Sequence, residues 1–205
     1  MNQSEHTSKQ FDIELEDLRS RVLQMGGLVE SQIMTAMEAL NIGSEDSVNR
    51  VLENEKQVNQ CEKDIDDACI HLVARRQPAA SDLRLIMGIS KVVTDLERIG
   101  DEADKIARRA RAIYARGVLN IPQTIDIPST SQKAVLMLRR VLDAMARLDA
   151  PEATKIIADD KLIDIEFSAI MRQLITYMME DPRTITTSLD IVWIAKAFAI
   201  QTISK

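Results

Sequence analysis

Apolar residues recur at steps of three and four along most of the chain, which is the pattern of amphipathic α-helices. A first long helix is predicted by the stripe Leu18, Val22, Met25, Val29, Ile33, Ala36 and Leu40. A second helix is predicted where apolar residues repeat every seven positions, at Val51, Val58, Ile65 and Leu72. The most regular stripe predicts a third helix, carrying Leu85, Ile89, Val92, Leu96, Ile99, Ala103, Ile106, Ala110 and Ile113.

The breaks between these stripes fall at residues that stop or start helices. After the first stripe, Gly43 lies past the expected helix end and Ser44 is the candidate N-cap of the next helix. The second helix should end near Arg76 because Pro78 cannot continue it. Ser81 is the candidate cap of the third helix.

A connector is predicted between residues 117 and 131, where Gly117, Pro122 and Pro128 interrupt the helical pattern. Beyond it, Pro151 should start a fifth helix and Pro182 should end it before a partial sixth. A fourth helix, between the connector and Pro151, is predicted by the stripe Val135, Leu138, Leu142, Met145 and Leu148.

The second half of the chain therefore repeats the helix order of the first, and short segments repeat with it. Ala36-Met37 reappears as Ala144-Met145, and Glu55-Lys56 reappears as Asp160-Lys161. The number of residues that separates each segment from its copy is too large for a solenoid repeat and suits a duplicated domain. We predict an all-α fold of two tandem three-helix bundles, at residues 8–117 and 129–205.

The composition agrees with this fold and narrows the classes of partner. Hydrophobic residues make up 45% of the chain and aromatic residues only 3%, a balance that favours helices over sheets. The net charge is −6, with 32 acidic and 26 basic residues. No broad basic surface is expected, so the sequence predicts no nucleic-acid partner.

The sequence also predicts a cytoplasmic protein without a membrane span. The polar start, MNQSEHTSKQF, lacks the basic and apolar regions of a secretion signal. The most apolar stretch, residues 191–200, contains Lys196 and is far shorter than the roughly 20 residues that a spanning helix needs.

No arrangement of residues predicts an enzyme. A di-iron oxidase bundle needs Glu-x-x-His pairs, and neither His6 nor His71 has a glutamate three residues before it. The pair Gly26-Gly27 lies inside a predicted helix and lacks the lysine and hydroxyl of a phosphate-binding loop.

Acidic residues on the second and third helices raise a different possibility. Glu62 and Asp66 are four residues apart, as are Glu97 and Asp101, so each pair projects from one face of its helix. A solvated acidic face is the ordinary interpretation of one such pair. Two pairs facing each other across antiparallel helices repel, however, and a cation with hard oxygen ligands, such as Mg²⁺, Ca²⁺, Mn²⁺ or iron, would relieve that repulsion.

The most specific signal is the run from Ala74-Arg75-Arg76-Gln77-Pro78 to Ser81-Asp82-Leu83-Arg84, which continues to Asp95-Leu96-Glu97-Arg98-Ile99-Gly100-Asp101. Leu23-Gln24-Met25-Gly26 and Met178-Met179-Glu180-Asp181-Pro182 accompany it. In these motifs the chain resembles the PhoU family, the accessory regulators of bacterial phosphate-specific transport, from about Phe11 to Phe198.

The resemblance implies a pair of three-helix bundles that bind metal ions through Glu/Asp-x-x-x-Asp motifs, here Glu62 with Asp66 and Glu97 with Asp101. Asp160 and Asp164 have the same spacing in the second copy and are further candidates. The metal would be a divalent or iron-type ion, such as magnesium, manganese or iron.

The resemblance further implies negative control of the phosphate-starvation response and of phosphate uptake. The protein would link the ATPase subunit of the phosphate-specific transporter to a sensor histidine kinase, and would form a homodimer. The alternative is a purely structural helical adaptor in which the acids serve solubility and no metal binds.

The sequence departs from the family in its last helix. A second Glu-Arg-Ile-Gly-Asp run is expected there, yet Ala195-Lys196-Ala197-Phe198 is followed by Ala199-Ile200-Gln201-Thr202-Ile203-Ser204-Lys205. We expect a truncated sixth helix, which would leave apolar surface on the fifth exposed and make the second bundle the less stable one.

Overall fold

The computed structural model describes residues 3–117 and 126–200, which form six α-helices and one short 3-10 helix, with no strand among them. The predicted all-α fold is confirmed. In chain order the elements are α1 (Gln3–Ile42), α2 (Glu45–Arg76), α3 (Ala80–Ala115), α4 (Ile127–Arg147), α5 (Ala150–Glu180), η1 (Pro182–Thr184) and α6 (Ile185–Ile200).

Most helix ends follow from the local sequence. The backbone N–H of Ser47 donates to the Ser44 hydroxyl at 3.0 Å, so Ser44 caps α2 as predicted. Gly43 before it has a φ of +66°, a conformation that glycine adopts without steric cost. The predicted cap at Ser81 is wrong, because α3 begins at Ala80 and its N-cap is Ala79, which makes no side-chain capping bond.

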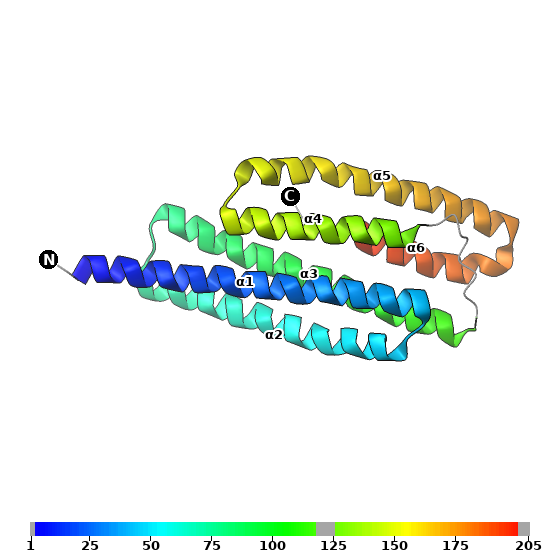
Figure 1. Ribbon diagram of the computed structural model, residues 1–205, viewed down its shortest axis with the longest axis horizontal. Helices are drawn as coiled ribbons and strands as arrows, with labels where there is room; N and C mark the ends of the chain where they lie inside the picture. Colours follow the sequence, from blue (N-terminus) through cyan, green and yellow to red (C-terminus); the bar gives the residue numbers. More distant parts are fainter. Residues whose placement is uncertain (1–2, 118–125, 201–205) are drawn as a thin grey trace.

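The long helices α1, α2 and α3 pack side by side as the first bundle (Figure 1). The predicted apolar stripes meet inside it, and Val22, Val29, Val51, Val58 and Ala103 are all fully buried. Burial of these stripes supplies the main stabilisation of the bundle, because isolated helices are only marginally stable in water.

The second group of helices lies along one side of the first bundle (Figure 1). Helix α4 packs against α1, and α6 packs against α3, while α5 contacts only α4, α6 and η1 among the described elements. Gly26 of α1 allows the close approach, because a Cβ there would lie 2.5 Å from Cδ1 of Leu142 on α4.

Helix α6 is much shorter than its counterpart α3, with 16 residues against 36. Phe198 near its end is fully buried, whereas Ile157, Leu162 and Ile165 on α5 are about 60% exposed. This agrees with the expected exposure of apolar surface on the fifth helix. Residues 201–205, on which the predicted truncation partly depends, lie outside the described residues.

Among the helices described, none combines the length and the apolar character that crossing a membrane requires.

Candidate metal centre

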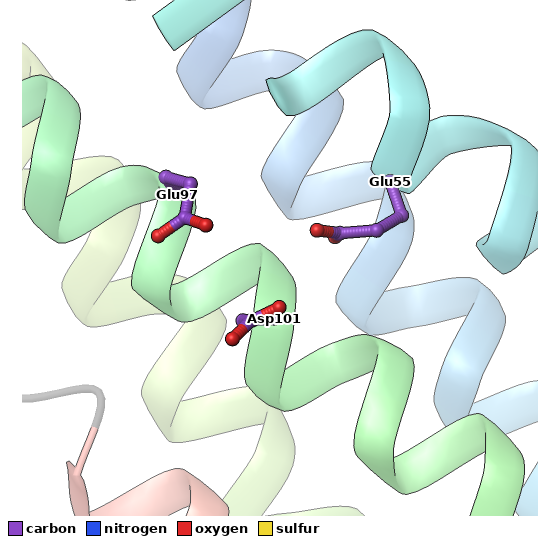
Figure 2. A group of neighbouring side chains, drawn as sticks. All are labelled: Glu55, Glu97 and Asp101. Carbon is purple, nitrogen blue, oxygen red and sulfur yellow. The ribbon is translucent and has the colours of Figure 1, made fainter.

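Three carboxylates from α2 and α3 converge where these antiparallel helices face each other. Glu55 of α2 and Glu97 and Asp101 of α3 each offer an oxygen atom, and the three atoms lie within 4.8 Å of one another. Figure 2 shows Glu97 and Asp101 one turn apart on α3, across from the extended side chain of Glu55. We call these three residues the acidic cluster.

The structure places the two other predicted acids of this bundle along the same helix interface. The charge of Glu62 contributes to the raised pKa of Glu97, after burial and the charge of Asp101. Asp66 accepts a hydrogen bond from the Ser90 hydroxyl at 2.7 Å. Neither Glu62 nor Asp66 belongs to the acidic cluster itself.

Sequence reasoning missed Glu55 as a site residue and used it only as a marker of the internal repeat. A signal was present, because Glu55 precedes Glu62 by seven residues and therefore lies on the same side of α2. The offset between the two antiparallel helices then decides which acid of α2 meets Glu97 and Asp101.

The acids of the second copy are not gathered in the same way. Asp160 is partly buried and one of its oxygens has no hydrogen-bond partner, whereas Asp164 is exposed. In the part of the chain that the structure describes, neither joins a group of three potential metal ligands. The repeat spacing from Pro78 to Pro182 assigns Gln201 and Lys205 to the positions of Glu97 and Asp101, and both lie outside the described residues.

Burial and mutual repulsion act together on the acidic cluster. The pKa of Glu97 is raised, first by burial and then by the charges of Asp101, Glu62 and Glu55. The pKa of Glu55 is also raised, chiefly by burial and further by Asp101 and Asp104, although hydrogen bonds oppose the shift. Glu97 and Glu55 thus carry their charges at a cost that a bound cation would reduce.

Glu97 and Asp101 are less exposed than the solvated acidic face that is the ordinary interpretation of such a pair. Glu55, Glu97 and Asp101 are all partly buried. Asp104, one turn further along α3, is only 8% exposed and one of its oxygens has no partner. Its other carboxylate oxygen accepts from Nε of Arg108 at 2.6 Å.

Nearby donors hold Glu55 without neutralising most of the charge of the cluster. The amide of Gln32 donates to one oxygen of Glu55 at 2.7 Å, and the amide of Asn59 donates to the other at 2.9 Å. The ammonium of Lys105 lies 3.6 Å from Asp101, but it is half exposed and closer to Glu102, at 2.9 Å. Three carboxylates, one of them held by neutral hydrogen-bond donors and one near a half-exposed lysine, are a donor set that fits a hard divalent or iron-type cation.

Comparison with known proteins agrees with this arrangement of helices. The PhoU domain family matches the chain in two stretches, residues 22–110 and 127–198. The phosphate-specific transport system accessory protein PhoU of Escherichia coli is 45% identical over 197 residues, which cover 96% of this chain and 81% of that protein. A PhoU homolog of Pseudomonas aeruginosa is 48% identical over 92% of this chain and 77% of its own length.

Solved structures show the same fold. The crystal structure of PhoU from Pseudomonas aeruginosa superposes with a TM-score of 0.88 at 45% identity, covering 93% of this chain and 91% of that one. The phosphate transport system regulatory protein PhoU from Streptococcus pneumoniae gives a TM-score of 0.83 at 26% identity, covering 93% of this chain and 89% of that one. On the agreement of two domain matches, near-complete alignments and a shared fold, this chain belongs to the PhoU family.

Proposed function

We propose that this chain regulates phosphate-specific transport as a metal-binding accessory protein without catalytic activity of its own. The first part of the proposal rests on its relatives, which are named as accessory proteins of that transport system. The metal-binding part rests on one observation, the convergence of Glu55, Glu97 and Asp101 within 4.8 Å.

The acidic cluster suits a binding role better than a catalytic one. Its carboxylates lie on two long helices of a packed bundle, so the protein supplies a rigid set of oxygen ligands. A bound cation would supply positive charge between α2 and α3 and so relieve the carboxylate repulsion that adds to burial in raising the pKa of Glu97. Occupancy would in this way stabilise the first bundle by favouring the folded state over the unfolded chain.

The partners follow from the family resemblance. We propose that the chain acts in the cytoplasm as a homodimer, between the ATPase subunit of the phosphate-specific transporter and the sensor histidine kinase. When phosphate is plentiful it would keep the starvation response off.

The test uses the double variant Glu97→Gln with Asp101→Asn, which keeps side-chain size and removes two charges. Mn²⁺ is titrated into the purified protein, and a phosphate-response reporter is followed in cells that lack their own regulator. We expect the wild-type chain to bind Mn²⁺ and repress the reporter at high phosphate, and the variant to lose both properties.

The matched control is Glu53→Gln with Asp64→Asn, which removes two charges from exposed positions of α2 outside the acidic cluster. It should bind Mn²⁺ and repress as the wild type does. Repression by the Glu97 and Asp101 variant at full strength, without Mn²⁺ binding, would instead establish the metal-free structural adaptor. Failure of the wild-type chain to alter the reporter would refute the regulatory role.

A further inference from the structure

Gln32 is a fully buried polar side chain that joins all three helices of the first bundle. It projects from α1, and its Nε2 donates to an oxygen of Glu55 on α2 at 2.7 Å. The same nitrogen donates to the backbone carbonyl of Gly100 on α3 at 3.1 Å. One amide group therefore connects the acidic cluster to the interior of the bundle.

The orientation of this amide is set by its partners. Both neighbours of Nε2 are acceptors, a carboxylate and a carbonyl, so the reverse orientation would place the amide oxygen against two other oxygens. The observed orientation leaves Oε1 buried with no hydrogen-bond partner. At an ordinary core position, an apolar residue would avoid the cost of a buried oxygen without a hydrogen bond. The presence of glutamine therefore points to a role for its hydrogen bond to Glu55.

Close packing around the amide limits the positions that Glu55 can adopt. A Cβ at position 100 would lie 3.3 Å from Oε1 of Gln32, 3.3 Å from Oε2 of Glu55 and 3.2 Å from Cγ1 of Val58. A methyl group at position 100 would therefore push these neighbours away by a few tenths of an ångström. Asn59 holds the second oxygen of Glu55 at 2.9 Å, so both oxygens are fixed by neutral donors.

We propose that Gln32 is the positioning residue of the metal site, which holds the Glu55 carboxylate toward Glu97 and Asp101 while leaving its negative charge available to a cation. This inference rests on the proposed metal-binding function. A lysine or arginine in the same place would also hold Glu55, but its charge would compete with the metal ion. A neutral amide orients the ligand and adds no positive charge, which is the role of the outer hydrogen bonds around many metal ligands.

The test is the affinity of the full chain for Mn²⁺ alone, measured for the wild type and for Gln32→Met, which has similar length and no donor. We expect the variant to bind Mn²⁺ about 10- to 100-fold more weakly, the usual effect of removing such an outer partner. In a Glu55→Gln background the same Gln32→Met change should have no further effect, because Gln32 acts through the Glu55 carboxylate.

A control separates positioning from simple loss of stability. Val29→Ala, one turn earlier on α1 and fully buried, should destabilise the bundle and leave Mn²⁺ affinity within about twofold of the wild type. Should Gln32→Met not fold, Gly100→Ala tests the same contact by pushing one methyl group toward Gln32 and Glu55, and it should weaken Mn²⁺ binding too.

The outcomes distinguish this inference from the function on which it rests. If the wild type binds Mn²⁺ and the Gln32→Met or Gly100→Ala protein binds it equally well, the positioning role is overturned and the metal site stands. If Val29→Ala weakens binding as much as Gln32→Met does, the role is also overturned. If the wild type binds no Mn²⁺, the proposed metal site falls together with the positioning role.

Discussion

At the scale of single residues, the charges of the acidic cluster lower the stability of the folded protein. Glu97 is partly buried beside three other carboxylates, and its pKa is raised above the ordinary value of 4.5 by burial first and by those charges second. The ionised form of Glu97 is therefore less favourable in the folded protein than in the unfolded chain. Placing such groups together destabilises the folded state, a pattern typical of functional sites.

A substitution at Glu97 should accordingly stabilise the metal-free protein. Because the folded pKa is raised, wild-type stability from this group is greatest at low pH, where Glu97 is protonated in both states. It falls as pH rises through the range above 4.5 and then levels off. We expect Glu97→Gln to raise the free energy of unfolding by about 0.5–1 kcal/mol at pH 7.

The measurement is urea unfolding in the presence of a chelator, with the variant compared to the wild type at pH 7 and pH 4. The gain should shrink at pH 4, where the wild-type carboxyl is protonated as well. Glu53→Gln, at an exposed site beside Lys56, is the control and should give no gain at either pH. A Glu97→Gln protein that is less stable than the wild type at pH 7 would contradict the argument.

At the scale of helices, one glycine lies where α1 and α4 pack closely against each other. Gly26 is buried, and a Cβ there would lie 2.5 and 2.7 Å from the two methyl groups of Leu142. Gly27 next to it is exposed, and a Cβ at that position would meet no atom within 4 Å. The two adjacent glycines form a natural pair of test and control.

Alanine at these two positions should therefore have opposite effects. Gly27→Ala should stabilise the protein by about 0.5–1 kcal/mol, because alanine favours the helix. Gly26→Ala should lose about 1 kcal/mol or more, since the added methyl group overpacks the α1–α4 interface. Urea unfolding measures both, and in a Leu142→Ala background Gly26→Ala should cost little further stability, because the obstructing side chain is gone. Equal effects at Gly26 and Gly27 would show that the glycine is not needed for packing.

The helices and their apolar stripes could be predicted from sequence, because burial of one helix face places apolar residues at steps of three and four. Val22 and Val58 were assigned to the core on that basis, and both are fully buried. The acidic cluster was predicted only in part. The pattern identified Glu97 and Asp101 as neighbours on α3, but it could not set the offset of α2 against α3, which brings Glu55 to them.

Gln32 illustrates a second limit of the periodic pattern. It lies on the buried side of α1, between apolar positions of the stripe. Because Gln32 itself is polar, the apolar pattern assigns it no role. Its partners are 23 and 68 residues away along the chain, so its function depends on the three-dimensional packing of three helices. The role of a polar residue inside a core can be assigned only when its hydrogen-bond partners are known.

At the scale of the whole molecule, the two groups of helices are packed to different degrees. Helix α3 lies between the other helices of its bundle and α6, and 12 of its 36 residues are buried. Helix α5 has four buried residues among 31, namely Ile156, Ile163, Ile170 and Leu174. It contacts only α4, α6 and η1 among the described elements, so fewer apolar contacts oppose its opening.

Hydrogen exchange should reveal this difference directly. Amide protons near Ile157 and Leu162, on the part of α5 with exposed apolar side chains, should exchange at least about tenfold faster than those near Ile99 and Ile106 on α3. Exchange in α5 reports local opening, because few buried contacts must be broken to expose its backbone, whereas exchange in α3 requires the first bundle to open. Adding Mn²⁺ should slow exchange in α2 and α3, which carry the acidic cluster, and leave α5 unchanged. Protection of α5 equal to that of α3 would mean that contacts among α4, α5 and α6 are as stabilising as the complete core of the first bundle, and the unequal packing would then have no consequence for stability.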